Sequence, residues 1–246
     1  MADRHLAWEG LYNARDLGGL ATLDGGLTRR GAIVRSDSLQ NLEARGWEEV
    51  EAYGVRTVID LRDESEIGAD AAPRPESIET VNIPLDVTEA RDFWDVWGNG
   101  PQFATPLYYG PHLERFPERS ARVIKAIATA RPGGVAFHCQ GGRDRAGQIS
   151  MLVLALAGVE PAAIAADYAL SDERLRPLYL SRGEEDEGPK VAAYLREQGT
   201  TASALIVELL AVLDVEATLL RAGLEPRDLV ALRRRLVPDA AGPPQG

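Results

Sequence analysis

The stretch GVAFHCQGGRDRAGQISMLVLALAG, residues 134–158, decides the fold of this chain. It opens with GVAFHC at 134–139, a short apolar run that is typical of a buried strand, and closes with QISMLVLALAG at 148–158, an apolar helix. The glycine-rich loop GGRDRAG joins them. This succession is typical of an α/β protein with a central, mainly parallel sheet and helices on both faces.

The loop between this strand and this helix predicts an anion-binding site. Free backbone N–H groups and the positive end of a helix dipole favour an anion at a helix N-terminus. Gly141, Gly142 and Gly147 allow the main chain to curl around an oxyanion. Arg145 can then hold two phosphate oxygens with its planar guanidinium group.

Cys139, the only cysteine of the chain, is the candidate nucleophile. A thiol beside an arginine at a helix N-terminus is expected to ionise near neutral pH, and a thiolate that faces a bound phosphate is placed for in-line attack. A lone buried cysteine is more often inert packing. Here the strand, the glycines and the spacing to Arg145 favour a nucleophile that forms a phosphocysteine intermediate.

The sequence outside this stretch alternates short apolar runs with helical patterns in its first two thirds and is helical in its last third. Strands are predicted at 31–39, ending near Arg35, at 55–61 and at 79–85, and helices at 41–54, 113–130, 161–170, 190–199, 203–213, 214–223 and 226–236. We expect a single domain over 1–238 with a disordered tail at 239–246. Residues 86–112 and 160–200 are candidate lid segments.

Composition excludes several classes of function. A net charge of -11 over 246 residues argues against a sequence-independent nucleic-acid binder, which needs a basic surface. No run approaches the roughly 18 apolar residues of a membrane span, and the N-terminus lacks a secretory signal, so a cytoplasmic location is expected. One cysteine and three histidines give no zinc-ligand spacing and no internal disulfide, and no metal or cofactor is predicted.

Five stretches resemble one known family. Cys139 and Arg145 match the C-x5-R signature of the cysteine-dependent protein tyrosine phosphatase superfamily. HCQGGRDRAG resembles the HCxxGKDRTG form of a subgroup of atypical, mostly microbial tyrosine and lipid phosphatases. Three further stretches are similar to that subgroup's NxRDxGG, strand ending in Arg-Ser, and DLRxxxE patterns: NARDLGG at 13–19, GAIVRSDSL at 31–39 and VIDLRDESE at 58–66. The helical C-terminal region is similar as well, so the likeness covers nearly the whole chain.

The resemblance implies a protein tyrosine phosphatase-like fold and hydrolysis of a phosphomonoester. The substrate implied is phosphotyrosine, with phosphoinositide or phosphoserine/threonine as further substrates. Cys139 would be the nucleophile, Arg145 the transition-state clamp, and His138 would tune the thiolate through neighbouring hydrogen bonds. The residues that would bind the substrate phosphate are Gln140, Gly141, Gly142, Arg143, Asp144 and Arg145.

A general acid must protonate the leaving oxygen, and a carboxylate is the usual choice. Asp60 lies at the end of a predicted strand, and parallel strands deliver their C-terminal ends to the edge of the sheet where ligands bind. Asp144 lies in the loop itself and either acts as the acid or orients Arg145 through a salt bridge. Both candidates stay open at this point.

Two residues of the loop depart from the pattern of the subgroup. Arg143 stands where Lys is usual and either contacts a second phosphate or an acidic flank of the substrate, or is a solvated surface residue. Ala146 replaces a Thr or Ser whose hydroxyl would help the sulfur to leave. Its loss should slow hydrolysis of the intermediate rather than its formation, unless Gln148 or Ser150 compensates.

Several further residues have two interpretations each. Asn13, Arg15 and Asp16 either border the site or form a turn held by Asx-type hydrogen bonds. The aromatic group at 93–97 (Phe93, Trp94 and Trp97) either walls a substrate pocket or belongs to the core. Arg62 and Glu66 are expected to form a structural ion pair.

Two other functions remain as alternatives. One is a pseudophosphatase that binds phosphate without turnover, which Ala146 favours. The other is a sulfurtransferase, which the five residues between Cys139 and Arg145 disfavour, because that class usually has a shorter loop.

Overall fold

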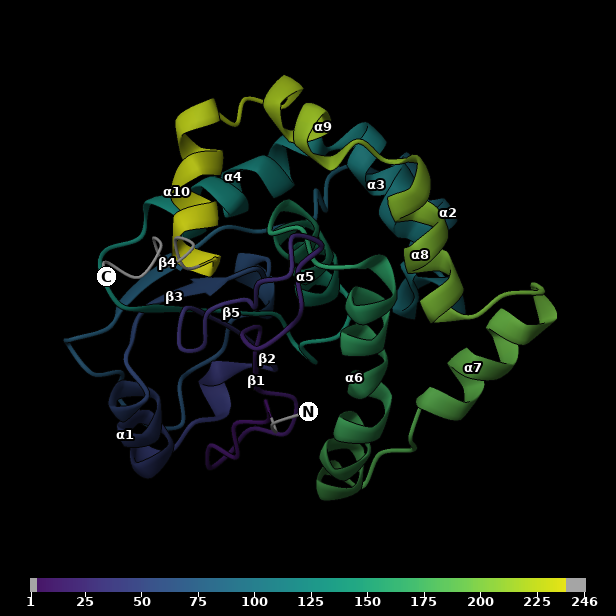
Figure 1. Ribbon diagram of the computed structural model, residues 1–246. Helices are drawn as coiled ribbons and strands as arrows, with labels where there is room; N and C mark the ends of the chain where they lie inside the picture. The colour runs from purple at the N-terminus through teal and green to yellow at the C-terminus, as the bar shows by residue number, and fades with distance from the viewer. Residues whose placement is uncertain (1–3, 238–246) are drawn as a thin grey trace.

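The computed structural model describes residues 4–237, in which five strands form one sheet in the order β1-β2-β5-β3-β4 (Figure 1). The strands are β1 (Arg15–Asp16), β2 (Ile33–Ser36), β3 (Val55–Asp60), β4 (Glu79–Asn82) and β5 (Gly134–His138). Strand β1 pairs antiparallel with β2 at one edge, and the other three pairs are parallel. The predicted fold class, a mainly parallel sheet flanked by helices, is confirmed.

The helices account for most of the remaining chain. They are α1 (Ala44–Ala52), α2 (Arg91–Trp97), α3 (Tyr109–Arg115), α4 (Pro117–Thr129), α5 (Arg145–Leu156), α6 (Pro161–Arg182), α7 (Gly188–Glu197), α8 (Ala202–Val212), α9 (Val215–Arg221) and α10 (Pro226–Leu236). The helical last third is therefore confirmed. The predicted tail at 239–246 lies outside the described residues. Across residues 4–237, no helix combines the length and apolar character needed to cross a membrane.

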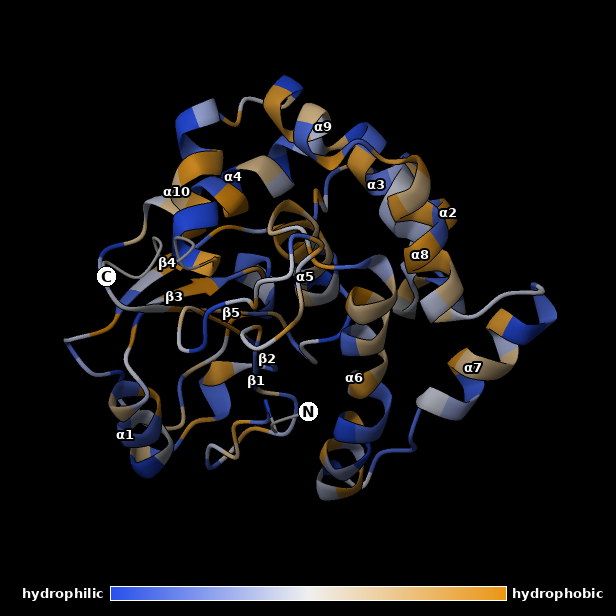
Figure 2. Ribbon diagram, viewed as in Figure 1, coloured by the Kyte–Doolittle hydropathy of each residue, from blue (hydrophilic) through white to orange (hydrophobic). Residues whose placement is uncertain are grey.

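Alternate residues of the central strand supply two cores, as the two-residue period of a strand requires. Val135 and Phe137 belong to the larger core, which packs against α4, α5 and α10, whereas Ala136 belongs to the smaller core beneath α1. Figure 2 shows β3 and α5 largely in orange, while the outer helix α10 carries both blue and orange turns. The sheet is therefore covered on both faces, which accounts for the unbroken apolar run Val135–Phe137 in β5.

Several boundaries differ from the prediction, and helix α6 runs to Arg182 instead of ending at residue 170. The helix predicted at 113–130 is two helices, because Pro117 lacks an N–H group and disfavours a helical conformation at Phe116, whose φ is -130° and ψ is 46°. The strand predicted to reach residue 85 ends at Asn82. Segment 86–112, a candidate lid, contains α2, two 3-10 turns (Pro101–Ala104 and Pro106–Tyr108) and the start of α3.

The parallel register brings three strand ends together at one edge of the sheet. Ser36 of β2 and Asp60 of β3 both lie opposite His138 of β5. Cys139 follows directly after β5, the central strand of the five. The residue thus emerges at the middle of the C-terminal edge, where ligands of open α/β sheets bind.

Candidate active site

The proposed nucleophile and the proposed phosphate clamp line the same cavity. Cys139 follows β5 and Arg145 is the first residue of α5, and both border a cavity of about 220 Å³. Both residues are nearly enclosed, with 3% of Cys139 and 8% of Arg145 exposed. The sulfur and the guanidinium group therefore belong to one concave space that can admit a phosphoryl group.

The carbonyl groups of the loop are held by residues outside it. Each contact joins an outside donor to a loop oxygen: Ser38 N to Gln140 O (3.1 Å), Asn13 Nδ2 to Gly141 O (2.9 Å), Arg35 Nη2 to Gly142 O (2.8 Å) and Arg143 O (3.1 Å), and Tyr109 Oη to Asp144 O (2.6 Å). In the described part of the chain, the N–H groups of residues 140–143 donate to no protein acceptor. Amides left free in this way are available to an oxyanion.

Two glycines of the loop are required by close packing. Gly142 has a φ of 68°, and a Cβ there would lie 2.4 Å from the backbone carbon of Ser36. A Cβ on Gly147 would lie 2.6 Å from the hydroxyl of Tyr109. The loop can therefore follow this path only where these side chains are absent.

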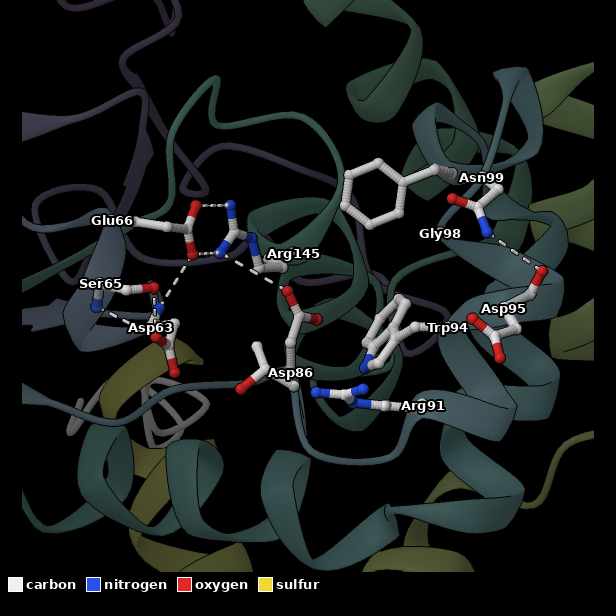
Figure 3. Close-up of a pocket in the computed structure, with 12 residues that line it drawn as sticks. Asp63, Ser65, Glu66, Asp86, Arg91, Trp94, Asp95, Gly98, Asn99 and Arg145 are labelled. Atoms are coloured by element: carbon white, nitrogen blue, oxygen red, sulfur yellow. Dashed lines mark hydrogen bonds and ion pairs between the residues drawn. The ribbon is translucent and has the colours of Figure 1, made fainter.

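The guanidinium group of Arg145 is held by Glu66. The two Glu66 carboxylate oxygens accept from Nη1 and Nη2 at 2.5 and 2.7 Å, a two-pronged ion pair that Figure 3 shows from the side of the neighbouring cavity. Burial opposes the charge, but the hydrogen bonds that Arg145 donates to Glu66, together with nearby negative charges, outweigh it and raise the pKa of Arg145. A guanidinium has five N–H groups, so three remain for substrate.

The predicted ion pair between Arg62 and Glu66 is wrong. Arg62 instead pairs with Asp60 at 2.8 Å, and its nearest contact to Glu66 is a 3.5 Å approach to the main-chain oxygen. No local pattern indicates the true partner of Glu66, because Arg145 lies 79 positions along the chain. Glu66 is therefore a site residue that sequence reasoning missed.

Replacing Glu66 should lower kcat/KM, because the guanidinium of Arg145 would lose the partner that fixes its orientation. We expect roughly a tenfold loss for Glu66→Ala, in line with the value of a charge-assisted hydrogen bond, and a smaller loss for Glu66→Gln, which keeps one acceptor. Steady-state kinetics with an aryl phosphate measure this effect. Glu64→Ala, on the exposed neighbouring position, is the matched control. Equal kcat/KM in the Glu64 and Glu66 variants would contradict the role.

Asp60 is committed to Arg62 rather than to the cavities. Its side chain accepts two-pronged hydrogen bonds from Arg62, and only 1% of the residue is exposed. Burial acts to raise the pKa of Asp60, but Arg62 and the nearby His138 lower it overall. A carboxyl group with a lowered pKa holds no proton near neutral pH, which disfavours Asp60 as a general acid.

His138 lies beneath the loop, fully buried. Its Nε2 atom is 3.6 Å from Asp60 Oδ2, and its Nδ1 atom is 3.2 Å from the main-chain oxygen of Cys139. Burial lowers the pKa of His138 to about 4, so the ring is neutral at physiological pH. His138 therefore contacts the main chain of Cys139, and its predicted influence on the thiolate stays a prediction.

Asp144 and Arg143 contact each other at the rim of the cavity that contains Cys139. Arg143 Nε lies 3.4 Å from Asp144 Oδ1, which also accepts from the hydroxyl of Tyr168 at 3.3 Å. No salt bridge joins Asp144 to Arg145 among the described residues, so the predicted orienting role is not found. Arg143 is buried and lines the cavity, which excludes the interpretation as a solvated surface residue.

A carboxyl group that sequence reasoning missed, Asp86, borders a second cavity of about 420 Å³. Arg145 and Phe103 line both cavities. Figure 3 shows Asp86 between Arg145 and Trp94, and its Oδ2 atom is 3.5 Å from Arg145 Nη1. The side chain is 10% exposed, and Oδ1 has no hydrogen-bond partner within residues 4–237.

Burial raises the pKa of Asp86 to about 6, although the charge of Arg145 acts in the opposite direction. This carboxyl group therefore holds its proton over a large part of the physiological range. A signal was present in the sequence, because Asp86 directly follows the predicted strand 79–85, while Asp60 ends the strand Val55–Asp60. The rule that placed Asp60 at the edge of the sheet also applies to Asp86.

The N-terminal motif serves both of its predicted roles. Asn13 contacts the loop at Gly141, whereas Asp16 accepts from Gly18 N at 2.7 Å in an Asx-type turn. Arg15 and its neighbour Arg35 lie buried against the carboxylate of Asp167 in α6, at 3.3 and 2.9 Å. Although burial acts in the opposite direction, the charges of these arginines lower the pKa of Asp167, so this internal carboxylate stays ionised. The cluster ties α6 to the strands beneath the loop.

The aromatic group at 93–97 divides between the two interpretations. Phe93 is buried and Trp97 packs against the larger core, whereas Trp94 lines the second cavity. Neither proposed substitute for the missing hydroxyl at Ala146 is directed to the sulfur. Gln148 contacts the buried pair His112 and Ser120, and Ser150 donates to the main-chain oxygen of Ala146 at 2.7 Å.

Comparison with known proteins agrees with this geometry. The model of the family described as "Tyrosine phosphatase family" matches residues 6–238. A Cupriavidus necator protein provisionally named a tyrosine-protein phosphatase is 32% identical over 178 residues, which cover 70% of this chain and 64% of that protein. A tyrosine-protein phosphatase of Nostoc commune is 34% identical over 142 residues, 57% of this chain and 48% of that protein.

A third relative covers more of both chains. The triple specificity protein phosphatase PtpB of Mycobacterium tuberculosis is 26% identical over 232 residues, 80% of this chain and 81% of PtpB. The first two relatives are longer, and the chain matches less than two thirds of the length of each.

Proposed function

The chain belongs to the tyrosine phosphatase family, and on that premise we propose that it hydrolyses phosphomonoesters, with phosphotyrosine as substrate, through a phosphocysteine intermediate. One observation carries the proposal. Cys139 and Arg145 line one cavity at the end of a loop whose carbonyls are held from outside and whose amides are free. A thiolate, a guanidinium and main-chain donors are the groups that in-line displacement at phosphorus needs.

In the first step the Cys139 thiolate attacks phosphorus and the bond from phosphorus to the leaving oxygen breaks. The amides of residues 140–143 and the free N–H groups of Arg145 stabilise the charge on the equatorial oxygens. The leaving oxygen takes a proton from a general acid as it departs. The products of this step are a phosphocysteine and the free hydroxyl compound.

In the second step water attacks the phosphorus of the phosphocysteine and the bond from sulfur to phosphorus breaks. The carboxylate that gave up its proton takes one from this water, so the enzyme returns to its starting protonation state. Ala146 offers no hydroxyl to the departing sulfur, and Gln148 and Ser150 have other partners. We therefore expect the second step to limit turnover.

We propose Asp86 as the general acid, in preference to Asp60 and Asp144. Its raised pKa of about 6 keeps a proton available, and its Oδ1 atom has no partner in the described chain. Asp60 is bound by Arg62, and Asp144 is held by Arg143 and Tyr168. Asp86 also lies beside Arg145 and so next to the phosphoryl group in this proposal.

Arg143 supports a wider range of substrates in the same site. Its guanidinium group is buried, lines the cavity that contains Cys139, and has an Nε atom without a hydrogen-bond partner within residues 4–237. A second phosphate of a phosphoinositide would suit such a group. We propose phosphoinositide and phosphoserine/threonine as secondary substrates, to be compared with phosphotyrosine by kcat/KM.

The two predicted lid segments support a covered site. Phe103 from 86–112 and Leu175, Tyr179 and Arg182 from 160–200 all line the cavity that contains Cys139. We propose that both segments cover the bound substrate within one domain over 1–238.

Rapid-mixing kinetics with p-nitrophenyl phosphate test the proposal. We expect a burst of one p-nitrophenol per enzyme followed by a slower steady state, with acid quenching that traps phosphate on Cys139. Ala146→Ser should raise the steady-state rate and leave the burst rate nearly unchanged. The pseudophosphatase alternative requires vanadate binding without any burst. Transfer of sulfur from thiosulfate to cyanide would instead support the sulfurtransferase alternative.

A further inference from the structure

A cavity lined by arginines lies at the edge of the sheet opposite to Cys139. It has a volume of about 450 Å³ and borders the starts of three parallel strands, at Ala32, Gly54 and Gly134. We call it the basic pocket, after the four arginines that line it: Arg29, Arg30, Arg234 and Arg235. Its lining includes no carboxylate.

Three of the four arginines of the basic pocket form no ion pair in the described part of the chain. Within residues 4–237, Arg29, Arg234 and Arg235 form no ion pair, although the chain carries 38 acidic and only 27 basic residues. Arg235 is half-buried and donates to the main-chain oxygens of Ala130 and Gly133 at 2.5 and 2.7 Å. Burial lowers its pKa, and no nearby carboxylate offsets that effect.

Helix stabilisation explains only part of this cluster. Arg234 and Arg235 lie in the last turn of α10, where cations interact favourably with the helix dipole. Arg29 and Arg30 come from a different segment, the turn before β2, and gain nothing from that dipole. Arg29 therefore brings a positive charge that has no ion pair within residues 4–237 to the end of α10, where a bound anion would interact favourably with it.

We propose that the basic pocket binds a small phosphate-bearing polyanion. A guanidinium group can donate hydrogen bonds to two phosphate oxygens, and arginines from two segments can contact one ion from opposite sides. The recess suits a small ion better than a nucleic acid, which needs a broad basic surface and is repelled by a net charge of -11. The basic pocket is separate from the active site, since β5 spans about 16 Å between them at the usual rise per residue.

Isothermal titration with inorganic pyrophosphate tests this site. The background is the double variant Cys139→Ser/Arg145→Ala, so that the active-site loop neither turns over the probe nor clamps it. We expect one binding site per chain in this background. Adding Arg29→Glu and Arg234→Glu should weaken the affinity at least tenfold, because two attractive contacts become repulsive.

The matched control adds Arg122→Glu and Arg176→Glu, two exposed arginines outside the basic pocket, and so makes the same change in net charge. We expect the pyrophosphate affinity of this control to stay within about twofold of that of the Cys139→Ser/Arg145→Ala background, because salt screens the long-range effect of the added negative charges. Equal weakening in both variants, or no pyrophosphate binding in the background, would overturn the proposal.

Two further measurements keep the test decisive. If the charge-reversal variant fails to unfold cooperatively on heating, Arg29→Gln and Arg234→Gln replace it, with at least a threefold loss of affinity expected. Sedimentation with vesicles that contain a phosphoinositide distinguishes a lipid headgroup from a free ion. Vesicle binding without pyrophosphate binding would overturn the proposal of a small soluble ligand.

Discussion

Cys139→Ser is expected to lower kcat for an aryl phosphate by at least roughly 10⁴-fold, the scale of loss when a covalent nucleophile is removed. A serine hydroxyl at this position would need a base to activate it. The neighbouring imidazole of His138 cannot serve, because it lies beneath the loop with its Nδ1 atom on the main-chain oxygen of residue 139. Stopped-flow measurement of p-nitrophenol release would show the burst abolished.

The same variant should keep its affinity for oxyanions. The free amides of residues 140–143 and the guanidinium group of Arg145, held by Glu66, do not depend on the sulfur atom. Inorganic phosphate should therefore bind Cys139→Ser about as tightly as it binds the parent protein, whereas Arg145→Ala should bind it more weakly. A Cys139→Ser protein with undiminished kcat would remove the basis of the phosphocysteine mechanism.

The local features of the site were predictable because each is encoded within a few residues. The apolar strand, the glycines and the apolar helix of residues 134–158 specify the loop without reference to the rest of the chain. The strand alternation also predicts which edge of the sheet presents Cys139. The split of the 113–130 helix is equally local, because Pro117 disfavours a helical conformation at Phe116, the residue before it.

Side-chain pairing over long separations was not predictable in the same way. Arg62 and Glu66 are four residues apart, but Arg62 forms its ion pair with Asp60, and Glu66 forms its ion pair with Arg145. The partner of each side chain depends on the three-dimensional path of the backbone through the 3-10 turn Glu64–Glu66. No periodic pattern in the sequence predicts this backbone path.

The general acid illustrates how burial decides between residues that look alike in the sequence. Asp60 ends one predicted strand and Asp86 follows another, and both strands lead to the same edge of the sheet. Asp60 meets a guanidinium two residues later, which lowers its pKa, whereas burial of Asp86 raises its pKa to about 6. The distinction lies in the local dielectric environment and hydrogen bonding, which only the folded chain defines.

Asp86→Asn is expected to slow the burst phase roughly 10³-fold for phenyl phosphate, whose leaving group needs a proton, and much less for p-nitrophenyl phosphate. The acid must be protonated to act, so the first step should slow as the pH rises above about 6, the pKa of Asp86. Hydrolysis of the phosphocysteine needs the ionised carboxylate and should quicken over the same interval. Burst and steady-state rates measured from pH 5 to 8 separate the two steps.

Asp86→Asn should lose the pH dependence of the burst rate and that of phosphocysteine hydrolysis together. A single carboxyl group gives up the proton in the first step and takes one back in the second. Asp144→Asn is the matched control, since it removes one charge from the same site but leaves the proton donor in place. If Asp144→Asn slowed the burst with phenyl phosphate far more than with p-nitrophenyl phosphate, and Asp86→Asn affected both substrates alike, the loop carboxylate would be the acid. In that case the raised pKa of Asp86 would reflect its burial beside Arg145 alone, without a role in proton transfer.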